Sequence, residues 1–246
     1  MPDALIRKLD HSGFLTEADR DTLRALPLRG REVAARHDLI REGERPETVR
    51  VVLEGFACRY RIPPRGRRQI LALMLPGDAC DMHAAILGEM DHSIGTLTPC
   101  RIVEIPHAVV FALEDEYPRI RRALWWATLV GESVVREWLV GMGQREASRQ
   151  MAHLFCELHL RLSMVGLATA TGCPQPLKQH DLADLLGITA VHVNRTLKEL
   201  HEAGLIVQER RRLEIPDVDR LHAYCGFDPS YLHLTPRMDP ERAATR

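Results

Sequence analysis

The chain has 246 residues, of which 45% are hydrophobic and 27% charged, a composition that can bury one large core or two ordinary ones. The formal net charge of −1 excludes an overall basic surface, so any surface for a polyanion has to be a local patch. No apolar run approaches the ~18 residues of a membrane span. The start, MPDALIRKLDHSG, has no signal-peptide pattern, and the six cysteines form no C-x-x-C pair. We therefore expect a cytoplasmic protein with reduced, mostly buried thiols and no membrane partner.

The first half of the chain predicts short helices followed by strands. Residues 3–26 form two helical patterns, the second capped by Thr16. Residues 31–105 then change to short, β-branched runs that glycine and proline separate at regular intervals. Short strands with frequent turn signals are typical of a β-barrel or sandwich.

A long apolar helix is predicted from Pro118 to about Gly141. A coiled-coil-like spacing of four and three residues relates its seam positions: Ile120, Leu124, Ala127, Gly131, Val134 and Trp138. Because the helix is apolar nearly all round, it has more than one face to bury. One face is expected on its own barrel and one, the seam, on a second copy; the alternative is a core helix of a monomer. The polar, glycine-containing segment 141–150 is interpreted as a hinge.

The segment DLADLLGITAVHVNRTLKELHEAGLI (181–206) has the pattern of a helix-turn-helix. The small Ala183 allows the two helices to approach, Gly187 tolerates the positive φ of the sharp turn, and Thr189 caps the second helix. Seven residues at the start of this second helix are expected to contact DNA: Thr189, Ala190, Val191, His192, Asn194, Arg195 and Lys198. Arginine pairs with guanine, asparagine with adenine, and small apolar side chains contact the thymine methyl group.

Two short strands follow, and they predict a basic wing. The strands are expected in LIVQE and LEI, with Arg210, Arg211 and Arg212 in the turn between them, suited to phosphate contacts. The preceding segment ATATGCPQP is interpreted as a loop. The alternative is an incidental helical hairpin beside a solvated turn, but the small residues, the capping threonine, the polar face and the basic turn coincide.

Over residues 5–225 the chain resembles the Crp/Fnr family of bacterial transcription regulators, most specifically in the helix-turn-helix and in PGD…LTPC (76–100). The resemblance implies an α+β fold: an N-terminal double-stranded β-helix (a β-roll like that of cyclic-nucleotide-binding domains), a long dimerisation helix and a C-terminal winged helix-turn-helix. The corresponding boundaries are 1–116 for the sensor domain, 117–143 for the dimerisation helix, 144–226 for the DNA-binding domain and 227–246 for a tail. It also implies a homodimer on a two-fold symmetric operator in double-stranded DNA, with RNA polymerase as a partner. The sequence contains no G-x-S-x-G, G-x-x-x-x-G-K-[ST] or H-E-x-x-H motif, so we expect no enzymatic activity.

Individual DNA contacts follow from the same resemblance. Arg195 matches the family's base-contacting arginine, and Asn194 matches the position before it. Val191 stands where many members carry a base-contacting glutamate, and Ala190 replaces a frequently polar position. These two departures predict a half-site that differs from the commonest sites of the family.

The effector pocket departs further from the family pattern. Cyclic-nucleotide members carry Gly-Glu-Leu after the PGD turn and Arg-Ser-Ala or Arg-Thr-Ala before the TPC-like turn. Here Asp81 and Met82 replace Gly-Glu, and Met90 and Asp91 replace the arginine and serine. Since a carboxylate repels a phosphate, we expect an effector other than cyclic AMP.

The identity of the effector, the operator and the choice between activation and repression stay open at the level of sequence. The candidate pocket residues are Asp81, Met82, His83, Met90, Asp91 and His92. His83 stands where the CO-sensing haem member of the family has its histidine ligand, so a haem- or metal-dependent gas or redox sensor is one alternative. A ligand-binding module without a role on DNA is another. The first cysteine is Cys58, which argues against an N-terminal iron–sulfur cluster.

Overall fold

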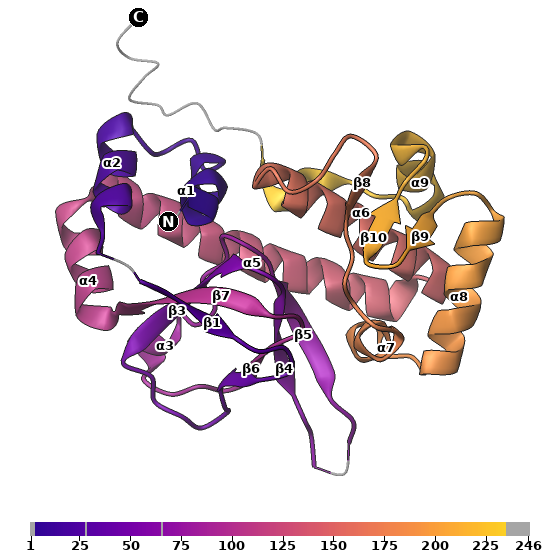
Figure 1. The fold of residues 1–246 in the computed structure, drawn as a ribbon, viewed down its shortest axis with the longest axis horizontal. Helices are drawn as coiled ribbons and strands as arrows, with labels where there is room; N and C mark the ends of the chain where they lie inside the picture. Colours follow the sequence, from indigo (N-terminus) through magenta and orange to yellow (C-terminus); the bar gives the residue numbers. More distant parts are fainter. Residues whose placement is uncertain (1–2, 28, 65, 235–246) are drawn as a thin grey trace, which may run out of the picture. The chain divides into compact units, whose positions relative to one another are not determined.

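The computed structural model describes residues 3–27, 29–64 and 66–234 (Figure 1). The chain divides into two compact units. The first unit comprises residues 1–57, 74–134 and 230–246, and the second unit comprises residues 58–73 and 135–229. Among the described residues, no helix has the length and apolar character needed to cross a membrane. Most of the predicted tail, residues 235–246, lies outside the described residues.

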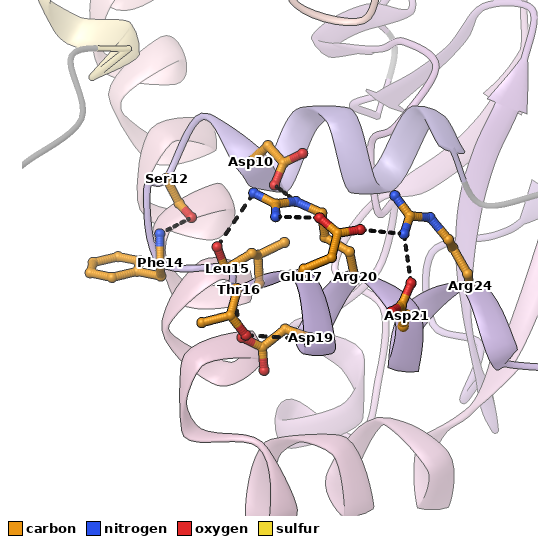
Figure 2. A network of polar contacts seen from close by, with 10 residues as sticks. All are labelled: Asp10, Ser12, Phe14, Leu15, Thr16, Glu17, Asp19, Arg20, Asp21 and Arg24. Atoms are coloured by element: carbon orange, nitrogen blue, oxygen red, sulfur yellow. Dashed lines mark hydrogen bonds and ion pairs between the residues drawn. The ribbon is translucent and has the colours of Figure 1, made fainter.

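The first unit begins with two short helices, α1 (Asp3–Asp10) and α2 (Glu17–Ala25). Thr16 caps α2 as the sequence predicts, because its hydroxyl accepts from the Asp19 N–H and the Asp19 carboxylate accepts from the Thr16 N–H. Arg20 joins the two helices through an ion pair of 2.7 Å with Asp10 (Figure 2). These contacts fix the N-terminal helices to each other.

Seven strands form two sheets. They are β1 (Gly30–Val33), β2 (Asp38–Ile40), β3 (Thr48–Glu54), β4 (Ala57–Arg61), β5 (Gln69–Met74), β6 (Ser93–Thr96) and β7 (Cys100–Pro106). One sheet has the order β1-β7-β3 with antiparallel pairs, and the other has the order β2-β6-β4-β5. The expectation of short strands over residues 31–105 is confirmed.

The core of the first unit lies between its β3–β7 strands and its helices. Alternate residues of β3 and β7, among them Val49, Val51, Val103 and Ile105, are buried against Leu9 of α1. Ile120 and Ala123 of the long helix α5 (Pro118–Gln144) belong to the same cluster, as do Val110 and Leu113 of α4 (His107–Glu116). A one-turn helix, α3 (Ala84–Leu87), follows the PGD turn.

The segment predicted as a hinge is mostly helical. Helix α5 continues through Gly141 and Gly143 to Gln144, and α6 (Ala147–Met164) begins three residues later. Only Arg145 and Glu146 lie outside the helices. The non-helical break is therefore limited to these two residues, and a hinge in this segment stays a prediction. Backbone hydrogen bonds of the two helices outweigh the low intrinsic helix propensity of the two glycines.

The second unit combines helices with a small sheet. After α6 come β8 (Gly172–Pro174), α7 (Gln179–Leu186), α8 (Ala190–Glu202), β9 (Val207–Glu209), β10 (Arg212–Glu214) and α9 (Val218–Cys225). The short 3-10 helix η1 (Pro229–Leu232) follows, and its residues from Ser230 onward belong to the first unit. The sheet has the order β8-β10-β9. Strand β8 corrects the expectation of a loop, because Cys173 pairs with Leu213 of β10 and is fully buried. The succession of β domain, long helix and helix-turn-helix with a small sheet confirms the predicted α+β fold.

Candidate nucleic-acid interface

The turn between α7 and α8 has the geometry that the sequence predicts. Gly187 has φ of 69°, a left-handed conformation, and its N–H donates to the Ala183 carbonyl to close α7. Thr189 caps α8, because its side-chain oxygen accepts from the His192 N–H at 3.2 Å. These bonds end α7 at Gly187 and fix the first turn of α8.

The predicted contact residues of α8 lie mostly in solvent. Thr189, Ala190, Asn194, Arg195 and Lys198 are exposed, Val191 is 82% exposed, and His192 is half-buried. The opposite face of the helix buries Val193, Thr196 and Leu200. Sequence reasoning did not single out Thr196, whose fully buried hydroxyl belongs to the core rather than to the exposed face.

Two carboxylates on α8 lie one turn after its basic side chains. The Arg195 guanidinium is 3.6 Å from Glu199, and the Lys198 ammonium is 3.6 Å from Glu202. All four groups are more than half exposed, so each pair contributes little to stability. The pairs hold the two cations loosely, and phosphate or base acceptors can replace the carboxylates at small cost.

The wing places two of its three arginines in the turn. Arg210 and Arg211 connect β9 to β10, and Arg210 has a left-handed φ of 52°. The Arg211 carbonyl accepts from the Gln175 N–H at 2.8 Å and fixes the turn to the β8 segment. Arg212 is instead the first residue of β10, with its Nε 2.5 Å from the Glu214 carboxylate. The prediction that Arg212 lies in the turn is therefore corrected: it is a strand residue whose charge Glu214 neutralises.

A buried carboxylate, Asp181, anchors the start of α7. It accepts from the Lys178 N–H at 2.9 Å and lies 3.1 Å from the Arg68 guanidinium. Arg68 also contacts Asp184 at 2.8 Å and stacks over the Tyr60 ring. Sequence reasoning missed this cluster. The acidic residue three positions after the cap signals the Asp181–Lys178 contact, but no local pattern marks Arg68, which lies 113 residues away.

In the first unit, Asp81 is bound to Arg50. The Asp81 carboxylate is fully buried, accepts from the Arg50 backbone N–H at 2.7 Å and from its guanidinium at 2.8 Å. The Arg50 Nε is also 3.5 Å from Glu104. Burial raises the pKa of Asp81, and the contacts with Arg50 oppose this rise. Both carboxylates therefore neutralise the Arg50 guanidinium.

The two methionines of the predicted pocket are packing residues. Met90 is 1% exposed, and Met82 packs against the core cluster of the first unit. Met90 is therefore a buried packing residue in this structure, and contact of either methionine with an effector stays a prediction.

His83, Asp91 and His92 come together beside them. Their possible ligand atoms all lie within 4.8 Å of one another. His92 Nδ1 is 2.6 Å and His83 Nε2 is 3.8 Å from the same Asp91 carboxylate oxygen. The two imidazole rings have centroids 5.0 Å apart. Three of the six predicted pocket residues thus form one cluster.

The apolar residues of α5 divide between its buried and exposed faces differently from the prediction. Ile120 and Val134 are buried within the chain, and Leu124 and Ala127 pack against the core of the first unit. The assignment of Ile120 and Val134 to a surface for a second copy is therefore corrected. The exposed apolar side chains of the helix are Trp125, Leu129, Val135, Leu139, Val140 and Met142. Predicted seam residues Gly131 and Trp138 are half-buried.

Comparisons with known proteins match both halves of the chain. Residues 30–117 match the cyclic nucleotide-binding domain family, and residues 149–224 match the Crp-like helix-turn-helix domain family. The nitrogen fixation regulation protein FixK of Azorhizobium caulinodans is 31% identical over 173 residues, which are 70% of this chain and 68% of the relative.

Two further proteins are similar over more of the chain. The transcriptional activatory protein AadR of Rhodopseudomonas palustris is 29% identical over 219 residues, 89% of this chain and 90% of the relative. The solved structure of FixK2 from Bradyrhizobium japonicum superimposes with a TM-score of 0.72 at 23% identity, covering 81% of this chain and 98% of that one. This last likeness supports the fold.

Proposed function

Because the chain belongs to the Crp/Fnr family of transcription regulators, we propose that it binds a two-fold symmetric operator as a homodimer. The chain is a DNA-binding transcription regulator through its Crp-like helix-turn-helix, and the relatives are regulators rather than enzymes. The observation that carries the proposal is the exposed, capped start of α8, with Asn194 and Arg195 in solvent. In helix-turn-helix dimers such helices enter successive major grooves about 34 Å apart.

The base contacts are proposed from the chemistry of the exposed face. Arg195 donates two hydrogen bonds to a guanine, Asn194 pairs with an adenine, and Ala190 and Val191 contact thymine methyl groups. Val191 supplies no carboxylate to a cytosine. The half-site therefore has a thymine preference where a glutamate would select cytosine.

The wing arginines, the capping Thr189 and two side chains of α8 are proposed to contact the sugar-phosphate backbone of the duplex. Arg210 and Arg211 of the turn, with Thr189, His192 and Lys198, contact phosphates and set the position of α8 in the groove. These contacts contribute affinity and its dependence on salt rather than sequence preference.

The homodimer is proposed to form along α5. Trp125 and Leu139 are 62% and 71% exposed, and Leu129 lies one turn after Trp125 at 55% exposure. Exposed apolar side chains at helical spacing favour burial against an identical helix. Gly131 and Trp138, which the sequence also predicts in the interface, are half-buried and stay part of this proposal.

RNA polymerase is proposed as the protein partner that the DNA-bound dimer contacts. The support comes from relatives, since AadR is named as a transcriptional activatory protein. No residue of this chain is assigned to that contact.

The effector is proposed not to be a cyclic nucleotide. The fully buried Asp81, at the first position of the family's Gly-Glu pair, is bound to Arg50. Met90, at the position of the family's phosphate-binding arginine, offers no charge, and Asp91 stands at the adjacent serine position. A phosphate placed there would meet a carboxylate. The residues present therefore do not fit the ligand after which the domain family is named. Addition of cyclic AMP or cyclic GMP should leave the thermal midpoint unchanged, and a concentration-dependent rise would overturn this part of the proposal.

Selection of duplexes from a random-sequence pool with the full chain tests the function. We expect enrichment of a two-fold symmetric site whose half-sites are about one helical turn apart. Enrichment of an asymmetric single half-site would contradict the dimer. Absence of enrichment above a variant in which both Asn194 and Arg195 are alanine would contradict the assignment of α8.

A further inference from the structure

We propose that His83, Asp91 and His92 form a binding site for one divalent first-row transition-metal ion in the first unit. Two imidazoles and one carboxylate are a ligand set that binds Fe²⁺, Co²⁺, Ni²⁺ or Zn²⁺. The inference goes beyond DNA binding, because the ligand residues belong to the β domain and the site is measurable without DNA.

The separations of the three groups suit a single ion. Ligand atoms on one such ion bind at about 2.0–2.2 Å, so any two of them lie at most about 4 Å apart. The two separations from Asp91, 2.6 Å to His92 and 3.8 Å to His83, already satisfy this limit, and all three ligand atoms lie within 4.8 Å. A movement of less than about 1 Å by one flexible side chain brings all three ligand atoms within reach of one ion.

Two backbone segments hold the ligands in place. His83 precedes α3, and its carbonyl accepts from the Ile86 and Leu87 N–H groups. Asp91 and His92 follow Met90, whose N–H and carbonyl bond to Glu44 and Gly43 of a neighbouring loop. The segments are therefore fixed independently of the side chains that they present.

Burial and charge also favour a cation. The His92 side chain is 10% exposed and that of His83 23%, whereas Asp91 is 79% exposed. Asp91 supplies the one carboxylate of the cluster, and its oxygen faces both imidazoles. The exposed carboxylate leaves one side of the cluster open to solvent. An ion bound there would keep coordination positions for water or a small ligand, as three-ligand metal sites do.

Titration of the full chain with Co²⁺, followed by visible absorption, tests the site. We expect one ion per chain and d–d bands without sulfur-to-metal charge transfer, because the six cysteines are all buried elsewhere. Asp91→Asn removes the anionic ligand at the most exposed of the three positions and should weaken binding at least tenfold. The matched control Asp115→Asn, an exposed carboxylate on α4, should bind as the wild type does.

A second measurement needs no variant. Proton spectra of the imidazoles should show broadening of His83 and His92 by substoichiometric Co²⁺, with the exposed His37 unaffected. Equal broadening of all histidines, equal affinity of Asp91→Asn and wild type, or no saturable binding would overturn the proposal. A Soret band in the purified protein would also overturn it, by assigning His83 to haem iron. Each result is independent of DNA selection, so failure of the metal site leaves the operator proposal standing.

Discussion

The guanidinium of Arg68 lies 3.1 Å from the carboxylate of Asp181, which is fully buried at the start of α7. The same guanidinium is 2.8 Å from Asp184, one turn further along α7. An arginine of the β4–β5 segment therefore fixes the first helix of the helix-turn-helix. Because α7 supports the angle of α8, this pair has a structural effect on DNA binding without touching DNA.

Replacement of Arg68 by alanine is expected to destabilise the second unit by about 1–3 kcal/mol, because Asp181 loses a charge-assisted hydrogen bond and stays buried. The loss is limited by the 25% exposure of the Arg68 side chain. Urea denaturation followed by circular dichroism measures it. The exposed neighbour Arg67→Ala is the control. Equal midpoints for the two variants would show that the pair contributes nothing.

Replacement of Arg195 by alanine is expected to change sequence preference. Loss of a bidentate contact to guanine should cost about 1–3 kcal/mol at one base pair of each half-site and relax the choice there. Binding to the selected operator and to single-base variants of it measures the effect. The partner carboxylate variant Glu199→Gln leaves the arginine in place and should keep the preference. Unchanged discrimination in Arg195→Ala would place base recognition elsewhere.

Replacement of Arg211 by alanine is expected to act on all duplexes alike. Removal of one phosphate-binding cation per subunit lowers affinity uniformly and reduces the slope of log K against log salt by about 1 for each phosphate that is no longer neutralised. Titrations at several salt concentrations with operator and unrelated DNA measure both. Arg212→Ala is the control, since Glu214 already neutralises that guanidinium. A larger effect of Arg212→Ala would reverse the assignment of the wing arginines.

Replacement of Leu129 by glutamate is expected to give monomers. Leu129 is 55% exposed on α5, so the charge is tolerated in one chain but would be buried between two. Sedimentation measures the mass. Phe111→Glu on α4, an exposed apolar residue outside α5, should remain dimeric. If both variants remained dimeric, the dimer interface would lie outside this face of α5.

The contrast between α5 and α8 shows which features the sequence can predict. The α8 face follows from local rules, because a capping threonine, a glycine turn and 3.6-residue periodicity fix which side chains point outward. Helix α5 is apolar on nearly every side, so periodicity alone cannot tell the face on its own core from the face for a partner. Ile120 and Val134 are predicted on the face for a partner, but they lie on the face buried against the chain's own core.

Contacts between residues far apart in the sequence could not be predicted from the sequence either. Arg50 and Asp81 are 31 residues apart, and Arg68 and Asp181 are 113 apart, so no spacing rule relates them. His83 and His92 were named as candidates, but only the fold brings their rings to 5.0 Å. The short break between α5 and α6 was also not predicted, because glycines that usually end a helix are tolerated in α5.

The stability of the second unit is expected to fall as the pH drops below about 6.5. His153 on α6 is buried, 3.3 Å from Glu137, and burial with the nearby charge of Arg145 lowers its pKa from 6.5 to about 4. The unfolded chain takes up a proton through pH 6.5, whereas the folded chain does so only near pH 4. The free energy of unfolding is therefore highest above pH 6.5. It falls between pH 6.5 and pH 4 by up to about 3 kcal/mol, at 1.36 kcal/mol per pH unit.

Urea denaturation between pH 7.5 and 4 tests this, with His153→Gln as the variant that cannot titrate. His153→Gln should be less stable than the wild type at pH 7.5, because it replaces a packed ring that contacts Phe227, but its stability should fall less steeply with pH. The exposed His37→Gln should follow the wild-type curve. Parallel curves for His153→Gln and the wild type would show that His153 titrates alike in the folded and unfolded chain.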